Sequence, residues 1–247
     1  MRDLRYIPRF DEILQSVFHI SVSSSSGTCF VCRLTDDKII VITCKHMFPN
    51  SDSDDTVNFS FMHYDGTTDD FSGTLLYSDT CQGDICAIIV NDSRFSCAIS
   101  FNSFEIPGRV FIGDEIFVLG FPFIMTNKTL RPEPIFIGDT FYPQAILRHG
   151  YVASSLVSDK DSKRILLDLH NNPGFSGSPI IKKGRISGTM DFGYIPIGVI
   201  SGYYYDKIND EIKTDTNSGI SYGCPFDIIW RQIMEYKYKN EENKSCK

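Results

Sequence analysis

The stretch "HNNPGFSGSPI", residues 170–180, carries Ser176 between two glycines and shortly after a proline. Glycine beside a reactive serine allows a tight turn and a close approach of the backbone to a bound molecule. In such a turn the N–H groups of Gly174 and Ser176 can point into one pocket, where they would bind a developing oxyanion. An ordinary Pro-Gly turn between two strands explains these residues equally well, so support must come from the rest of the chain.

The glycine spacing excludes two other common motifs. The nucleophile elbow of α/β-hydrolases has the pattern G-x-S-x-G, whereas the fifth position here is Ser178, and the chain shows no alternation of strands and helices. The glycine patterns of P-loops and of dinucleotide-binding folds are also missing from the sequence. A serine loop on a different architecture therefore remains to be considered.

Short apolar runs indicate an all-β chain. Of the 247 residues 42% are hydrophobic, and Gly, Pro, Ser, Asp and Asn separate runs such as "IIVITC" and "ICAIIV". One series of expected strands ends near residue 91 and a second begins near residue 115, while residues 92–108 show little periodicity. We therefore expect two β-barrel-like halves, residues 1–100 and 101–247.

The segment "FDIIWRQIMEYKYK", residues 226–239, is expected to form a helix after the second half. Its apolar residues Ile228, Ile229, Ile233 and Met234 recur at helical spacing. The charged residues that follow are expected to fray. The helix would therefore end the structured part of the chain.

The charge balance argues against a nucleic-acid partner. The formal net charge is −7 and the sequence has no block of lysine and arginine, so it lacks a basic footprint. No segment approaches the roughly 18 uninterrupted apolar residues of a membrane span. Residues 1–20 contain no apolar run of signal-peptide length. We therefore expect a soluble, cytoplasmic protein without a membrane partner.

The eight cysteines are expected to be free, buried thiols, because a chain of this length without a signal peptide rarely depends on disulfides. Cys29 and Cys32 have the spacing of a zinc-binding CxxC pair. No second pair and no paired histidines complete such a site. We therefore expect neither a metal nor a cofactor.

A catalytic serine requires a base, since its hydroxyl is a weak nucleophile. His46 directly follows the apolar run "IIVITC", which would hold the histidine rigidly at the end of a strand. A neutral base needs a carboxylate to fix its tautomer. Asp84 leads directly into "ICAIIV" and is costly to bury without a partner. Taken singly, His46 fits a strand end and Asp84 fits a turn.

The order of the three residues is more informative than any one of them. His46 and Asp84 lie in the first half of the chain and Ser176 in the second. This is one of the chain orders in which a His, Asp and Ser triad is known to occur. A site built from them would lie in the crevice between the two halves.

These motifs resemble those of the trypsin-like serine proteases, and are most similar to the bacterial high-temperature-requirement-A and glutamyl endopeptidase branch. The histidine motif T-x-x-H matches Thr43 to His46, and the aspartate motif D-I-A-[LV] is similar to "DICAII" with one extra residue. The serine motif N-P-G-x-S-G-[GS]-P matches Asn172 to Pro179 at every fixed position. Four supporting matches are "VLGFP" (118–122), "GYVAS" (150–154), "GVISG" (198–202) and "SGISYGCP" (218–225).

The resemblance implies a fold and a set of roles. The fold would be the chymotrypsin-like double six-stranded Greek-key β-barrel, here with a C-terminal helix. Ser176 would be the nucleophile, His46 the general base and then acid, and Asp84 the orienting carboxylate. The N–H groups of Gly174 and Ser176 would form the oxyanion hole. No PDZ-like domain is expected, because the sequence stops after the helix.

The resemblance also implies a substrate-binding strand. Residues Ser201, Gly202 and Tyr203 would pair with an extended substrate, and Ser201 would hydrogen-bond Asp84. His170 would lie near the base of the pocket for the P1 side chain, where it would favour an acidic or amide side chain, or pack in the wall of a small apolar pocket. Tyr203 would narrow the rim. The histidine usual in glutamyl enzymes is replaced by Ile200.

Two functions from different classes remain at this point. The first is a serine endopeptidase that cuts protein or peptide substrates. The second is a catalytically silent or partner-activated domain that binds another protein. Cys44 and Lys45, beside His46 where the family prefers small residues, and the tyrosines at 203–205 motivate the second. It also raises the expectation of an activating partner protein.

Overall fold

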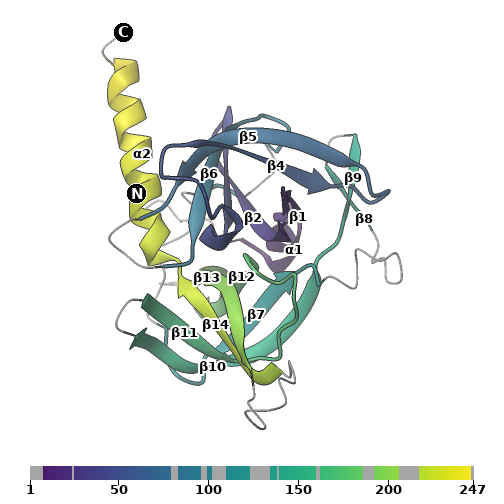
Figure 1. Ribbon diagram of the computed structural model, residues 1–247, viewed down its shortest axis with the longest axis vertical. Helices are drawn as coiled ribbons and strands as arrows, with labels where there is room; N and C mark the ends of the chain where they lie inside the picture. Colours follow the sequence, from purple (N-terminus) through teal and green to yellow (C-terminus); the bar gives the residue numbers. More distant parts are fainter. Residues whose placement is uncertain are drawn as a thin grey trace.

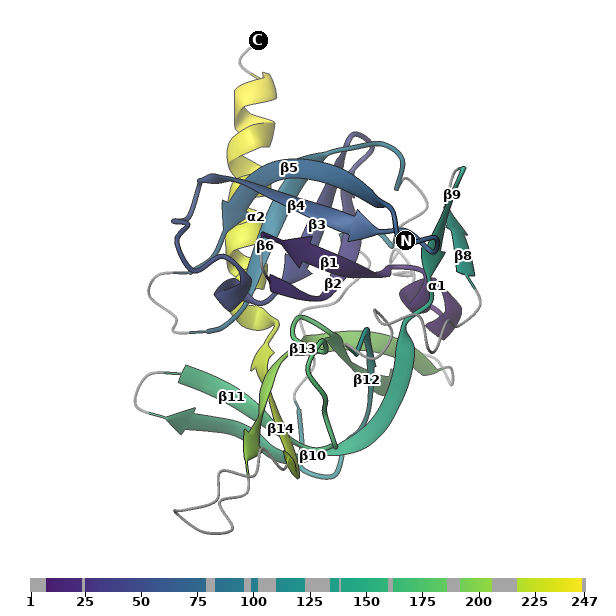
Figure 2. The same cartoon turned by 45° about the vertical axis from the view of Figure 1, so that its right-hand side comes forward.

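The chain folds into two β-barrels with a long helix at the C-terminal end (Figure 1). The computed structural model describes residues 8–23, 25–78, 83–95, 99–101, 110–122, 134–137, 139–159, 162–185, 192–205 and 217–245. The predicted all-β class and double six-stranded barrel are confirmed. The two barrels lie one above the other, with β1 and β2 of the first barrel next to the boundary that it shares with the second (Figure 2).

The first barrel is a closed sheet with the strand order β1-β2-β3-β6-β5-β4, in which every pair is antiparallel. Its strands are β1 (Val17–Val22), β2 (Ser25–Thr35), β3 (Lys38–Thr43), β4 (Thr56–Met62), β5 (Thr68–Leu76) and β6 (Cys86–Asn91). In β4 the buried residues Val57, Phe59 and Phe61 alternate with more exposed ones, as a strand with one buried face requires. The barrel interior is aromatic, with the Phe18 and Phe61 rings stacked at 5.1 Å.

The second barrel has the order β10-β11-β14-β13-β12-β7 and is also closed. Its strands are β7 (Glu115–Gly120), β10 (Ile146–Asp159), β11 (Ser162–Asp168), β12 (Pro179–Arg185), β13 (Phe192–Tyr205) and β14 (Asn217–Pro225); β8 (Pro134–Ile137) and β9 (Thr140–Pro143) form a separate hairpin. Phe175, which precedes Ser176, is completely buried in this core. The loop that carries Ser176 is thus anchored by its own phenylalanine.

Each terminal helix packs against the barrel that is more distant in sequence. The helix α1 (Phe10–Leu14) precedes the first barrel, yet the Phe10 ring packs against Tyr194 of the second at 5.1 Å. The helix α2 (Asp227–Ser245) follows the second barrel and buries Ile229 and Ile233 in the core of the first. It runs beside that barrel in both views (Figures 1 and 2). These crossed contacts join the two barrels at both ends of the chain.

The predicted C-terminal helix is confirmed but is longer than expected. It continues through the charged segment to Ser245, where fraying was expected. Charged side chains tolerate solvent on a helix, so polarity alone did not mark the helix end. Among the described residues, no helix is long and apolar enough to cross a membrane.

The described cysteines are free and buried, as predicted. They are Cys29, Cys32, Cys44, Cys86 and Cys224, while Cys81, Cys97 and Cys246 lie outside the described residues. Burial raises the pKa of the Cys29 and Cys32 thiols well above the usual value for cysteine, so both thiols stay neutral. They therefore pack as small apolar side chains.

His19 on β1 is a buried histidine without a polar partner. Only 4% of the residue is exposed, and neither ring nitrogen has a hydrogen bond. The ring packs edge-on against Phe121 at 5.9 Å. Burial lowers its pKa from 6.5 to about 4, so the folded protein keeps this side chain neutral in a range where an exposed histidine takes up a proton.

We expect His19 to destabilise the protein in mild acid. Above pH 6.5 the His19 side chain is neutral in both the folded and the unfolded protein. Between pH 6.5 and about 4 only the unfolded chain binds the proton, so the free energy of unfolding decreases as the pH is lowered. The loss is at most about 3 kcal/mol, from the size of the pKa difference. Urea unfolding of His19→Leu should show a weaker decline over this window than the wild type. The exposed His149→Gln serves as control, and equal declines for His19→Leu and wild type would contradict the account.

Candidate active site

The Ser176 loop, residues 169–178, joins β11 to β12 and depends on two glycines. Gly174 and Gly177 have φ angles of 100° and 85°, in the left-handed region that favours glycine. A Cβ atom at Gly177 would also overlap the Thr28 carbonyl and the Thr43 hydroxyl. The turn is closed by the Ser178 N–H, which donates to the Phe175 carbonyl at 2.9 Å. The loop therefore permits no side chain at position 177.

Thr28 on β2 holds this loop against the first barrel. Its N–H donates to the Ser176 carbonyl and its hydroxyl to the Gly174 carbonyl, both at 2.8 Å. The same hydroxyl accepts the Phe121 N–H at 3.0 Å, and the Thr28 carbonyl accepts the Thr43 hydroxyl at 2.8 Å. Thr28 is completely buried. Sequence reasoning missed this residue, because nothing local marks a threonine in a strand as a contact 146 residues away.

The second barrel holds the same loop from the other side. The Gly177 N–H donates to the Ile200 carbonyl at 2.8 Å, and the Ile200 N–H donates to the Ser178 carbonyl at 2.9 Å. The Cys44 thiol, next to the first-barrel strand β3, also donates to the Ile200 carbonyl at 3.0 Å. The loop is thus fixed between strands of both barrels, at their boundary.

Two N–H groups of the loop have no partner within the described residues. The carbonyls of Gly174 and Ser176 both bond to Thr28, but neither residue's N–H donates to another group. Ser176 is partly exposed. Two unpaired donors in one turn beside a serine are the arrangement that binds a developing oxyanion. The predicted positions therefore offer the required donors.

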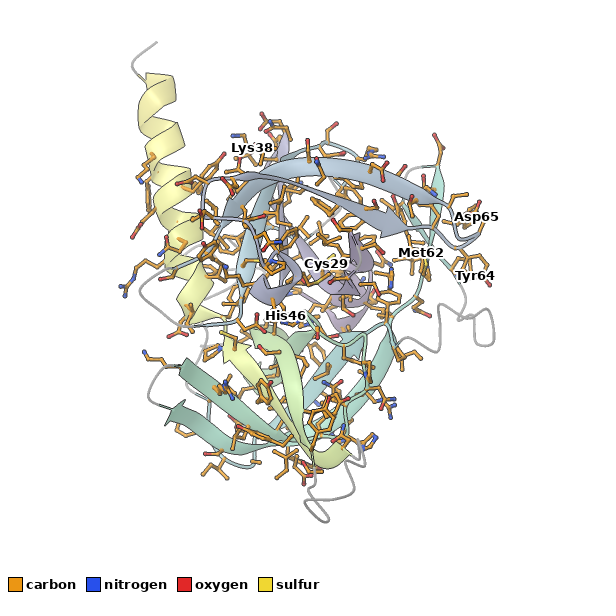
Figure 3. All side chains as sticks on the ribbon, in the orientation of Figure 1. Cys29, Lys38, His46, Met62, Tyr64 and Asp65 are labelled. Atoms are coloured by element: carbon orange, nitrogen blue, oxygen red, sulfur yellow. The ribbon has the colours of Figure 1, made fainter. Side chains whose placement is uncertain are left out.

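His46 and Asp84 are in direct contact, as the sequence led us to expect. His46 lies in the short helix η1 (Lys45–Met47) after β3, at the boundary of the barrels (Figure 3). One Asp84 carboxylate oxygen accepts the His46 N–H at 2.9 Å, and the other lies 2.7 Å from Nδ1. Because a carboxylate accepts only, Nδ1 carries the hydrogen in the neutral ring and leaves Nε2 as the proton acceptor.

The electrostatics of this pair favour a protonated imidazole. The hydrogen bond to Asp84 raises the pKa of His46, burial opposes this, and the negative charge of Asp84 adds to the increase. About half of the His46 side chain is exposed, so the ring is open to a molecule from solution. The pair can therefore take up a proton and hold the resulting imidazolium.

Ser176 adjoins the segment that carries His46 without bonding to the histidine. Gly27 separates them: a Cβ there would lie 2.8 Å from the Ser176 carbonyl and 3.4 Å from the Met47 sulfur. Among the described residues no hydrogen bond joins the Ser176 hydroxyl to His46. In free enzymes such a bond is often long and tightens when the substrate is bound. The structure therefore shows the contact between His46 and Asp84, and places the Ser176 loop against the strand that precedes them.

Ser201 does not make the contact that the resemblance implied. Its hydroxyl is buried without a hydrogen-bond partner, whereas Asp84 bonds to both the backbone and the ring of His46. The pairing of β13 with β14 shifts register between Ile200 and Gly202, on either side of Ser201. Such an irregularity redirects the side chain, and we attribute the missing contact to it.

The pocket side of the loop also differs from expectation. His170 is exposed, so its predicted packing in a pocket wall is wrong. The neighbouring Asn171 is 3% exposed; its side-chain oxygen accepts the Asn172 N–H at 2.8 Å, and its carbonyl accepts the Asn217 side-chain amide. Tyr203 is partly buried, with its ring 5.0 Å from Tyr205. Sequence reasoning missed Asn171, which directly precedes the motif Asn172–Pro179.

One group of side chains has the composition of a metal site. The donor atoms of Cys44, His46 and Asp84 lie within 4.8 Å of one another. Each already has a hydrogen-bond partner, the thiol with Ile200 and the other two with each other. Burial, above all, raises the pKa of Cys44, which disfavours the thiolate that metals prefer. Hydrogen bonding therefore accounts for these side chains without a metal.

Replacing Thr28 by valine should weaken the boundary between the barrels. Thr28→Val keeps the shape but leaves the Gly174 carbonyl and the Phe121 N–H buried without their partner. We expect the free energy of unfolding to fall by about 1–3 kcal/mol, measured in urea. Thr28→Ser is the control, because it keeps the hydroxyl and both bonds. A Thr28→Val protein as stable as the wild type would contradict the assignment.

Solved structures share this fold at low sequence identity. An inactive form of Rv3671c from M. tuberculosis H37Rv, crystallised as a serine-to-alanine mutant, has 16% identity and a TM-score of 0.53, covering 95% of this chain and 93% of that one. The inactive form of the Rv3671c protease itself has 15% identity and a TM-score of 0.54, covering 95% of both chains. Deg5 has 18% identity and a TM-score of 0.51, covering 90% and 88%. These likenesses support the barrel architecture.

The family is shown by the sequence match. A search of curated proteins finds no match to this chain. The model of the trypsin-like peptidase domain matches residues 27–188. The matched region includes His46, Asp84 and Ser176. This chain therefore belongs to the trypsin-like peptidase domain family.

Proposed function

We propose that the chain is a serine endopeptidase that uses Ser176, His46 and Asp84. The observation that carries the proposal is the double contact of the Asp84 carboxylate with the backbone and ring of His46. A carboxylate in this position fixes one tautomer of the imidazole and so presents Nε2 as a base. The unpaired N–H groups of Gly174 and Ser176 supply the complementary donors.

The first half of the reaction forms an acyl-enzyme. The Ser176 oxygen attacks the carbonyl carbon of the scissile bond while His46 Nε2 accepts the hydroxyl proton. The carbonyl oxygen becomes negative and is bound by the N–H groups of Gly174 and Ser176. The imidazolium is stabilised by Asp84 and then gives its proton to the leaving amine, so that the C–N bond breaks.

The second half of the reaction restores the enzyme. Water attacks the ester carbonyl, His46 Nε2 accepts a proton from this water, and the returned proton allows Ser176 to leave as a hydroxyl. The substrate would be held as an extended strand against Ser201, Gly202 and Tyr203 of β13. Backbone pairing of this kind accepts many sequences and leaves the selection to side-chain pockets.

The second candidate is a protein-binding domain that is catalytically silent or becomes active only when a partner protein binds. The missing hydrogen bond between Ser176 and His46 favours it, because a partner could complete this contact. Lys45, next to the base, lies with its Nζ 4.2 Å from the centre of the Tyr77 ring. In this form of the proposal the triad is competent only after a partner or substrate has bound.

A covalent probe separates the two candidates. A fluorophosphonate should modify the wild-type protein at Ser176, and Ser176→Ala should remain unmodified. Cleavage of denatured casein should fall by about a thousandfold or more in Ser176→Ala, because the nucleophile is absent. Labelling at another residue, or equal cleavage by both proteins, would contradict the endopeptidase. Labelling only after a partner protein is added would favour the gated form.

The pH dependence should report the contact between His46 and Asp84. The base must be neutral to accept a proton, and Asp84 raises its pKa above 6.5, so activity should fall through a midpoint above pH 6.5 on acidification. In Asp84→Asn the remaining effect is burial, which lowers the pKa, so the midpoint should move to lower pH. NMR titration of the His46 ring measures this independently of activity. An unchanged His46 pKa in Asp84→Asn would contradict the assigned role.

A further inference from the structure

Tyr222 on β14 packs against Gly202 of the predicted substrate strand. A Cβ atom at Gly202 would lie 2.5 Å from the Tyr222 hydroxyl, so this tyrosine occupies the place of a side chain at 202. Two residues further along the same face of β14, the Cys224 sulfur lies 2.7 Å from a Cβ built at Gly83, which precedes Asp84. The outer face of β14 therefore borders the catalytic carboxylate.

The charges around Tyr222 agree with this position. Burial raises the pKa of its hydroxyl, the Arg164 guanidinium lowers it, and the Asp84 carboxylate raises it again. The hydroxyl has no hydrogen bond to any described residue. An unpaired donor thus lies beside a strand that, in the proposed function, binds the substrate backbone.

Arg164 on β11 completes the feature. Its guanidinium carbon lies 4.6 Å from the centre of the Tyr222 ring, and the Tyr204 ring lies 5.2 Å from Tyr222 on the other strand. The neighbouring residues Ile165 and Leu167 point into the barrel core, so Arg164 points outward. Stacking on the tyrosine holds the guanidinium in a defined place.

Arg164 has no acidic partner among the residues that the structure describes. Within the described residues it forms neither an ion pair nor a hydrogen bond, whereas Arg94 bonds to both Asp92 and Asp69. A guanidinium held on a tyrosine ring, with no carboxylate bound to it among the described residues, is placed to bind a carboxylate of a second molecule. A guanidinium prefers a carboxylate in planar geometry.

We propose that Arg164 and the Tyr222 hydroxyl form a subsite for an acidic side chain of the substrate, upstream of the scissile bond at P2 to P4. This inference rests on the proposed function, because it assumes that the substrate pairs with β13. Gly202 has no side chain to cover Tyr222, so an alternate side chain of the bound strand can reach both groups. The substrate class is thus an extended peptide with Asp or Glu before the cleavage site.

Cleavage profiling of a peptide library tests the subsite. The wild type should prefer Asp or Glu over Gln or Asn at one position of P2 to P4 by about three- to tenfold in kcat/KM, as expected for a partly exposed ion pair. Arg164→Gln should remove this preference and Arg164→Glu should replace it with one for Lys or Arg. Tyr222→Phe should reduce it. Arg231→Gln on the exposed side of α2 is the matched control and should leave it intact.

Peptide binding separates failure of the subsite from failure of catalysis. Fluorescence anisotropy with Ser176→Ala, alone and combined with Arg164→Gln, measures acidic and neutral peptides without any cleavage. If acidic peptides bind more tightly than neutral ones, and this difference requires Arg164, the subsite is supported. If in addition no peptide is cut, only the proposed function fails. The inference would be overturned if Arg164→Gln still preferred acidic peptides. It would also be overturned if proteins that retain Arg164 showed no preference for acidic peptides in either cleavage or binding. Thermal melting confirms that each variant is folded.

Discussion

The four hydrogen bonds of Thr28 are the constraint on which the rest of the site depends. A buried threonine of the first barrel fixes two successive turns of backbone in the second, through the carbonyls of Gly174 and Ser176. Among the described residues, the N–H groups of Gly174 and Ser176 have no partner. The turn that carries these proposed oxyanion donors is therefore held by the opposite barrel, and the loop that carries Ser176 is tied to the strand β2, which pairs with the strand that leads to His46.

This arrangement explains why a site of this kind requires two barrels. His46 and Asp84 belong to the first barrel and Ser176 to the second, so their geometry is only as rigid as the boundary between them. Thr28 and the Cys44 thiol fasten the boundary near the site. The terminal helices fasten it at the periphery, each by packing against the barrel further away in sequence. The Ser176 loop, between β11 and β12, is thus held from both barrels.

The double barrel and the contact between His46 and Asp84 could be predicted from the sequence, since alternating apolar runs and short motifs depend on neighbouring residues. Thr28 could not, because its partner Gly174 is 146 residues away and its own surroundings are an ordinary strand. The position of Ser201 depends on an irregularity in strand pairing that no local pattern encodes. The exposure of His170 and the burial of Asn171 follow from contacts with β14. The pairing of Arg164 with Tyr222 likewise appears only when β11 and β14 become neighbours.

The central claim is that the Ser176 loop presents a nucleophile and two oxyanion donors to the base held by Asp84. The most direct test is a crystal structure of the protein after reaction with a peptidyl phosphonate. The account predicts a covalent bond from the Ser176 oxygen to phosphorus, a phosphonyl oxygen within hydrogen-bond distance of the Gly174 and Ser176 N–H groups, and His46 Nε2 facing the adduct. An adduct at Ser176 whose phosphonyl oxygen points away from both N–H groups, or a His46 ring separated from Asp84, would contradict it.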